Sequence, residues 1–131
     1  MADLLPGSFA GETSLVFKEE LQQQEVTHLV SKAAVWVVRE CIRENPDFIG
    51  HIKVIGEDYL GNRIYCSLTD PEQVVQPIFF PQKPQIKQMN LTWNCLVYGV
   101  TREKLESILL RLSRLMAGWP ECQSVQQKSL E

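Results

Sequence analysis

Cys66 and Ser67, taken with His51, form the one combination of residue types that could support nucleophilic catalysis. A thiol or hydroxyl needs an adjacent base to activate it, and the β-prone runs that carry these residues are predicted to pair as a hairpin. Strand alternation places Cys66 on the buried face, whereas Ser67 shares the face of His51. The pattern implies neither an aspartate to orient the histidine nor donors for an oxyanion. We therefore expect no catalytic residue, with Cys66 in the core and Ser67 on the surface.

Acid–base and nucleotide chemistry find equally little support. The adjacent carboxylates Glu57–Asp58 and Glu19–Glu20 point in different directions on a strand or a helix, so neither pair is a ready acid–base site. The chain contains no GxGxxG or GxxxxGK(S/T) loop that would cradle a phosphate. Gly56 and Gly61 flank a predicted hairpin turn, which is a sufficient reason for both glycines.

Metal and disulfide chemistry are not expected either. The four cysteines are widely spaced without a CxxC pair, and the two histidines lie far apart: Cys41, Cys66, Cys95, Cys122, His28 and His51. A structural zinc site needs closely spaced ligands. A chain of 131 residues can bury a sufficient core without disulfides. We expect no metal and no cofactor, and we interpret Cys41, Cys66 and Cys95 as small buried apolar residues.

The composition favours a protein partner over a nucleic acid or a membrane. The chain has 16 acidic and 13 basic residues and a formal net charge of −3, whereas dedicated nucleic-acid-binding domains usually carry a basic excess. Its apolar runs are far shorter than the eighteen or so residues of a membrane span. The N-terminus lacks the basic stretch and the unbroken apolar segment of a signal peptide. We expect a cytoplasmic protein of one domain.

Two helices are predicted from the periodicity of the apolar residues. The first covers about residues 19–44 and ends before Pro46, because the residue preceding a proline is disfavoured in helical conformation. The second covers residues 102–116. Thr101 is placed to cap its N-terminus, and Gly118 follows its C-terminus.

Three strands are predicted from their pairing or their alternation. Residues 51–57 and 63–69 form a hairpin, in which Gly61 supplies the positive φ of the reversal. Residues 90–98 alternate between apolar and polar side chains and form the third strand. Residues 13–17 form either an edge strand or the start of the first helix.

These elements predict an α+β fold. A small, antiparallel-rich sheet of three to four strands is expected to carry two amphipathic helices on one face. The domain is expected to span residues 13–118, with a flexible leader at residues 1–12 and a flexible tail at residues 119–131.

The face of the sheet opposite the helices is the main candidate for binding. Its predicted members mix aromatic, hydroxyl and amide groups with charged and aliphatic ones: His51, Lys53, Tyr65, Ser67, Asn94, Leu96 and Tyr98. Tyrosine suits a protein–protein contact, because its ring buries area while its hydroxyl keeps a hydrogen-bond partner. Three alternatives remain for this face: ordinary solvent exposure, a dimer or partner interface, and a shallow ligand site.

A line of basic residues on the first helix is a second candidate. Its members lie within about 60° of one another on a helical wheel, with Trp36 beside them: His28, Lys32, Arg39 and Arg43. Lys32, Arg39 and Arg43 could bind an anion, either a phosphate backbone or an acidic partner. The alternative is a solvated helix face whose charges pair locally, for example Glu40 with Arg43.

The proline-rich segment 70–89 is a third candidate. Its prolines argue against a central strand. Phe79 and Phe80 are too apolar for both rings to be exposed to solvent without a role in packing or binding. Adjacent residues of an extended segment point in opposite directions. Either both rings pack onto the domain, or one enters the core while the other stays available to a partner.

The missing catalytic signatures favour a non-enzymatic interaction or accessory domain that self-associates or binds another protein. The alternative is a small-molecule-binding or minor enzymatic domain. Its shallow site would lie on the open sheet face, around His51, Lys53, Tyr65, Ser67 and Asn94.

Overall fold

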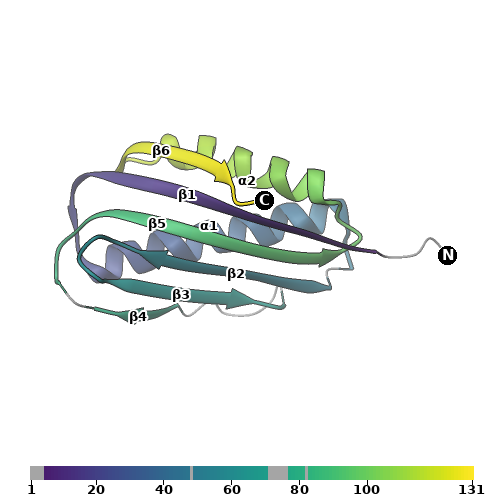
Figure 1. Cartoon of the computed structure of the whole chain (residues 1–131), viewed down its shortest axis with the longest axis horizontal. Coiled ribbons are helices and arrows are strands. Elements are labelled where there is room, and N and C mark those ends of the chain that lie inside the picture. The colour runs from purple at the N-terminus through teal and green to yellow at the C-terminus, as the bar shows by residue number, and fades with distance from the viewer. Residues whose placement is uncertain (1–4, 48, 71–76, 82) are drawn as a thin grey trace.

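The computed structural model describes residues 5–47, 49–70, 77–81 and 83–131. Figure 1 shows the elements in chain order: β1 (Pro6–Leu21), α1 (Gln23–Glu44), β2 (Gly50–Glu57), β3 (Arg63–Leu68), β4 (Ile78–Phe80), β5 (Ile86–Tyr98), α2 (Arg102–Ala117) and β6 (Cys122–Ser129). The α+β class with two helices is confirmed.

All six described strands belong to one antiparallel sheet of order β4-β3-β2-β5-β1-β6. The strand β5 lies between β1 and β2, which α1 connects, and β1 lies between β5 and β6, which α2 connects. Two interlocked split βαβ units arranged in this way give the ferredoxin-like order. The strands β3 and β4 extend that sheet beyond β2.

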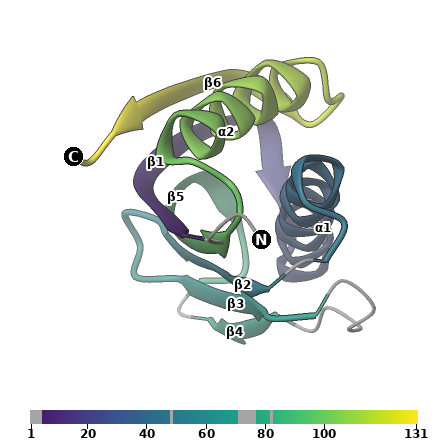
Figure 2. The ribbon, with the colours of Figure 1, turned by 90° about the vertical axis from the view of Figure 1, so that its right-hand side faces the viewer.

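Both helices cover the same face of the sheet. Figure 2 shows the sheet curling around α1 and α2, so that the helices occupy its concave side. The strands alternate accordingly: in β5, Leu91, Trp93, Cys95 and Val97 are buried, whereas the residues between them are more exposed. One contiguous core therefore lies between the sheet and the two helices.

The prediction of three to four strands is wrong, because the sheet has six. Residues 13–17 belong to the long strand β1, which already begins within the expected leader, and β4 and β6 lie in the proline-rich segment and in the expected tail. The strand β1 begins at Pro6 and pairs with β5 and β6 on its two sides. Two glycines of this segment, Gly7 and Gly11, are sites of close approach. A Cβ at Gly7 would lie 1.7 Å from the carbonyl oxygen of Val100, so only glycine lets the β5–α2 connection pass so near.

The strand β6 was missed because its sequence lacks an apolar alternation. It is an edge strand and buries chiefly Cys122, with Val125 partly buried against the core. Polar contacts replace the missing apolar ones. Trp93 Nε1 donates to Thr13 Oγ1 at 3.1 Å, and Thr13 Oγ1 donates to Gln127 Oε1 at 2.6 Å. This chain of hydrogen bonds joins β5, β1 and β6 through a threonine that is fully buried.

The other elements follow the predictions closely. The hairpin of β2 and β3 is confirmed, and Gly61 at its turn has a φ of 86°. The second helix is confirmed with its cap, since Thr101 accepts a hydrogen bond from the backbone N–H of Lys104. The first helix starts at Gln23 rather than at residue 19, because β1 continues to Leu21. No helix in the described part of the chain is long and apolar enough to span a membrane.

Candidate functional site

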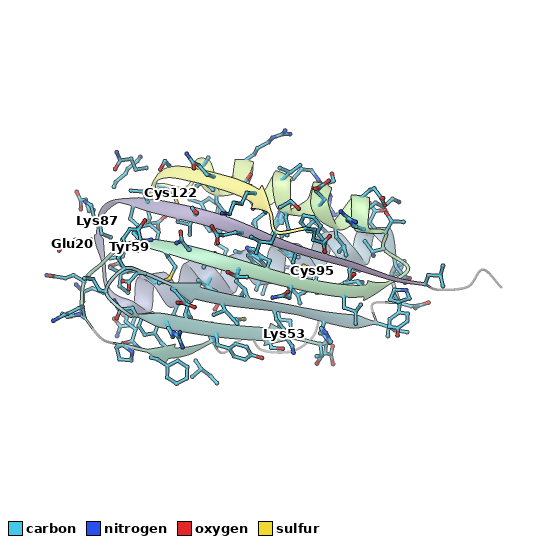
Figure 3. All side chains as sticks on the ribbon, in the orientation of Figure 1. Glu20, Lys53, Tyr59, Lys87, Cys95 and Cys122 are labelled. Carbon is cyan, nitrogen blue, oxygen red and sulfur yellow. The ribbon has the colours of Figure 1, made fainter. Side chains whose placement is uncertain are left out.

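The open face of the sheet brings most of the predicted face residues together. Lys53 on β2 lies between Ser67 on β3 and Asn94 on β5, to which it is paired in register. His51, two residues before Lys53 on β2, is paired with Leu96 on β5. Figure 3, which views the sheet from its uncovered side, labels Lys53 on this face. Five of the seven predicted residues therefore form one contiguous cluster.

The two tyrosines lie at opposite ends of that cluster. Tyr65 is paired with Ile55 on one side and Ile78 on the other, in the half of the face that includes β4. Tyr98 ends β5 and is paired with Pro6 at the start of β1. The predicted residues are thus neighbours on one side of the sheet, with Tyr65 and Tyr98 at opposite ends of the group.

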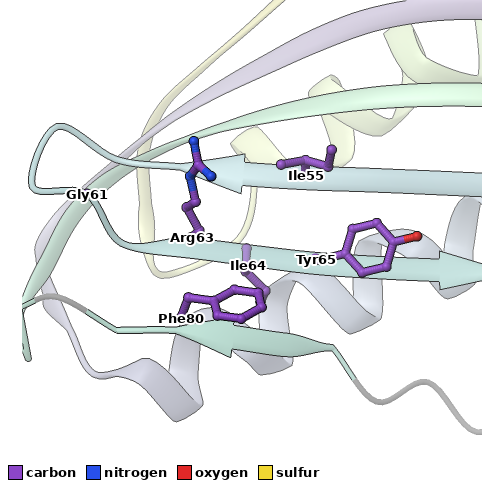
Figure 4. A pocket seen from close by; sticks show the side chains of 6 residues that line it. All are labelled: Ile55, Gly61, Arg63, Ile64, Tyr65 and Phe80. Atoms are coloured by element: carbon purple, nitrogen blue, oxygen red, sulfur yellow. The ribbon is translucent and has the colours of Figure 1, made fainter.

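A hollow of about 540 Å³ lies on the Tyr65 half of the face. Figure 4 shows its lining residues: Ile55, Gly61, Arg63, Ile64, Tyr65 and Phe80. Phe80 and Ile78 are each 54% exposed. The sheet here presents a group of apolar side chains beside the Arg63 guanidinium, which lies 3.7 Å from Glu57.

Phe79 and Phe80 point to opposite sides of β4. Phe79 is partly buried and packs against the core, whereas Phe80 stands on the open face beside Arg63. The structure thus packs one ring of the pair inward and leaves the other exposed; whether Phe80 meets a partner stays a prediction. Ile78, which completes the exposed apolar group, was not singled out from the sequence, although it shares a face with Phe80 by simple alternation.

A second hollow, of about 300 Å³, lies near the His51 end of the same face. Its lining includes His51, Asn94 and Leu96 together with Ser8 and Ala10 from β1. The contribution of β1 could not be anticipated, because that segment was expected to be a flexible leader. The arrangement places an imidazole and an amide in one shallow depression.

The thiols are held in their neutral form. Burial raises the pKa of Cys41 to about 12, with Glu40 and Glu44 adding to the shift, and burial raises the pKa of Cys66 to about 11. Burial also raises the pKa values of Cys95 and Cys122. A thiol must ionise before it attacks an electrophile or binds a metal, so these residues are poor nucleophiles and ligands at neutral pH. Among the described residues, no group of three acidic, histidine or cysteine side chains is arranged to hold a metal ion.

The basic residues predicted to lie along α1 have two different environments in the structure. Arg43 pairs with Glu40 at 3.2 Å, which confirms the predicted local pair. Lys32 and Arg39 instead line a hollow between α1 and α2, together with Trp36. The sequence offered no signal that Trp119 would join them, because its position depends on how the two helices pack.

Comparisons with protein-family models, with curated proteins and with solved structures find no match for this chain.

Proposed function

We propose that the protein is a non-enzymatic interaction module that self-associates through the Tyr65 half of its open sheet face. The observation that carries the proposal is the exposed apolar group formed by Ile55, Tyr65, Ile78 and Phe80 on three neighbouring strands. Ile55 is 38% exposed, and Ile78 and Phe80 are each 54% exposed. Contiguous apolar surface of this kind is typical of a protein–protein contact.

The chemistry of the rim supports a second copy of the chain as the partner. Arg63 and Glu57 lie side by side at the margin of the apolar group and are both more than half exposed. A two-fold contact presents the same surface from both sides. Each copy therefore offers both a cation and a carboxylate, which can pair across the interface.

The contact is expected to use the face of the sheet rather than the edge of β4. The strand β4 has only three residues and is flanked by Pro77 and Pro81. A short edge strand bounded by prolines offers little backbone for strand addition. The side chains of Ile78 and Phe80 would then carry the association.

Light scattering over a concentration series tests the proposal. We expect the parent chain to form dimers and the variant Ile78→Ser/Phe80→Ser to remain monomeric at the same concentrations, because the substitutions remove apolar area from the contact. Leu110→Ser is the matched control, since Leu110 is 42% exposed but lies on α2, on the other side of the sheet. A parent chain that stays monomeric throughout, or a Leu110→Ser variant that dissociates equally, would contradict the proposal.

A second candidate function is small-molecule binding in the hollow beside His51. It is favoured by the meeting of the imidazole of His51 and the amide of Asn94 in one depression. Thermal unfolding in the presence of a panel of polar metabolites tests it, because a ligand that binds only the folded state raises its stability. Any stabilisation should disappear in His51→Ala and persist in Phe80→Ser.

A further inference from the structure

A groove between α1 and α2 lies on the helical side of the molecule, away from the open sheet face. Figure 2 shows the two helices packed together within the curve of the sheet. The groove has a volume of about 410 Å³, and its lining is mainly apolar with a basic margin: His28, Ser31, Lys32, Val35, Trp36, Arg39, Leu115 and Trp119. It is therefore independent of the surface proposed for self-association.

The apolar floor is built by residues from both helices and from the turn after α2. Trp36 of α1 is partly buried, and Trp119 lies just beyond α2 and is nearly buried. Leu115 is 40% exposed and lines the same groove as the two indole rings. Two indoles and a leucine can bury large apolar side chains of a ligand.

Cations surround this floor. Lys32 Nζ stands 4.2 Å from the centre of the Trp119 ring, and the Arg111 guanidinium stands 5.8 Å from the centre of the Trp36 ring. Cation–aromatic contacts of this length hold the charged groups over the ring faces. The side chains of Lys32 and Arg111 are thereby positioned above the floor instead of being directed away from it.

The basic residues in and near the groove differ in whether they form ion pairs. Arg43 and Arg111 form ion pairs with Glu40 at 3.2 and 2.6 Å. Within the described part of the chain, Lys32 and Arg39 have no carboxylate within ion-pair distance, and the residues lining the groove include no acidic side chain. The groove therefore combines an apolar floor with two cations that have no anionic partner among the described residues.

We infer that this groove binds an acidic amphipathic helix of a partner protein. The groove follows α1 from His28 to Arg39, a rise of about 16 Å, which equals three turns of a bound helix. Apolar residues on one face of that helix would pack on Trp36, Leu115 and Trp119. Carboxylates beside them would pair with Lys32 and Arg39, as in other helix-in-groove contacts. A nucleic acid fits less well, because the floor is apolar and the chain carries a net charge of −3.

The three tryptophans of the chain make the test direct, because each gives a separate indole N–H signal by nuclear magnetic resonance. The probes are helix-forming peptides of about 16 residues with glutamates spaced to face Lys32 and Arg39, and with leucine, phenylalanine or methionine on the apolar face. We expect the indole signals of Trp36 and Trp119 to shift on titration. The signal of Trp93 should stay constant, since its N–H is buried and bonded to Thr13.

Charge exchange provides the matched control. Replacing the peptide glutamates with glutamine should weaken binding by about tenfold or more, and Lys32→Glu/Arg39→Glu should do the same to the acidic peptide. The double variant should instead bind a peptide with lysines at the same positions. Lys53→Glu, which reverses an exposed charge on the opposite face, should bind the acidic peptide like the parent.

Several results would overturn the inference. Equal affinity for the glutamate and glutamine peptides would show that the unpaired cations do not select the ligand. Failure of every peptide in the panel to bind with a Kd below about 1 mM would remove the groove as a helix site. Stronger binding of a short single-stranded oligonucleotide at the same indoles would assign the cations to phosphate recognition. Shifts confined to residues around Phe80 would place peptide binding on the open sheet face instead.

Discussion

Nη1 of Arg111 on α2 donates a hydrogen bond of 2.6 Å to Oε1 of Glu40 on α1, and this carboxylate is buried between the two helices. Arg43 approaches the other carboxylate oxygen at 3.2 Å from within α1. Among the described residues, Glu40 is the one acidic residue whose side chain is buried. The pair therefore links α1 to α2 through a buried carboxylate.

We expect Arg111→Leu to lower the free energy of unfolding by about 1–3 kcal/mol, because it removes the shortest hydrogen bond of a buried carboxylate. Urea denaturation measures the change. Lys104→Leu is the matched control, since Lys104 makes an equally short bond of 2.6 Å to Glu44 between the same helices, but both side chains are more exposed. Lys104→Leu should lower the free energy of unfolding by less than about 1 kcal/mol. The double variant Glu40→Leu/Arg111→Leu should be more stable than Arg111→Leu alone, because in the single variant the buried carboxylate keeps only its longer contact to the exposed Arg43.

Thr13 is expected to be essential for holding β6 in the sheet. Thr13→Val keeps the shape of the side chain but leaves the Trp93 N–H and the Gln127 carbonyl without the hydroxyl that joins them. We expect a loss of about 1–3 kcal/mol in unfolding free energy and faster amide hydrogen exchange in residues 122–129. Thr13→Ser preserves the hydroxyl and should protect β6 better than valine. Unchanged exchange in β6 after Thr13→Val would contradict this role.

The contrast between β1, β6 and the other elements shows what the amino-acid pattern can predict. The helices, the hairpin and β5 bury one repeating stripe or face of apolar residues, so their periodicity indicates both the element and its orientation. The first half of β1 contains Gly7 and Gly11 at buried positions, where periodicity expects large apolar residues. The strand β6 uses Gln127 where another strand would use an aliphatic residue. Both strands depend on neighbours that are remote in sequence.

The same reasoning explains which parts of the candidate sites were predictable. Alternation placed His51, Lys53 and Asn94 on one face, because strand geometry alone determines that placement. The separation of Tyr65 from Tyr98 required the pairing register of the three strands β3, β2 and β5. The groove beside Lys32 required the packing of α2 against α1, which brings Trp119 next to a residue that lies 87 positions earlier in the chain (119 − 32 = 87).

Gly7 and Gly118 offer a sharp comparison of two glycine positions. A Cβ at Gly7 would overlap the backbone oxygen of Val100, whereas a Cβ at Gly118 would meet its nearest atom at an ordinary 3.5 Å. Gly7→Ala should therefore lower the free energy of unfolding by at least about 1–3 kcal/mol. Gly118 has helical backbone angles, so Gly118→Ala should leave stability unchanged or raise it slightly. Thermal and urea denaturation of the two variants measure the difference, and equal effects would argue against the close approach at Gly7.

The two tyrosines of the open face should differ in their effect on self-association. Tyr65 lies in the apolar group with Ile55 and Ile78, whereas Tyr98 lies at the far end of β5 opposite Pro6. We expect Tyr65→Ala to weaken the dimer and Tyr98→Ala to leave it nearly unchanged. Sedimentation equilibrium of both variants at matched concentrations measures the association constants. A stronger effect of Tyr98→Ala would move the interface to the His51 end of the face.

The buried thiols predict how stability depends on pH in the alkaline range. The folded-state pKa of Cys41 is raised from 9.0 to about 12, and that of Cys66 from 9.0 to about 11. Below about pH 9 these thiols are protonated in both the folded and the unfolded protein, so the free energy of unfolding does not depend on their titration. Above about pH 9 the thiols ionise in the unfolded protein but not in the folded one. The free energy of unfolding therefore falls with rising pH until the folded-state pKa is passed. We expect the unfolding free energy to decrease between about pH 9 and pH 11.

Cys41→Ala isolates this effect, because the variant differs from the parent only in lacking this thiol. The variant should lose less stability than the parent over the same pH interval, even if the substitution lowers its stability at neutral pH. An aromatic disulfide reagent gives an independent measurement. At about pH 8 it should leave all four buried cysteines of the folded parent unmodified and should react with them only in denaturant. Rapid reaction of Cys41 or Cys66 in the native protein would instead indicate accessible thiolates and would reopen a nucleophilic role for these residues.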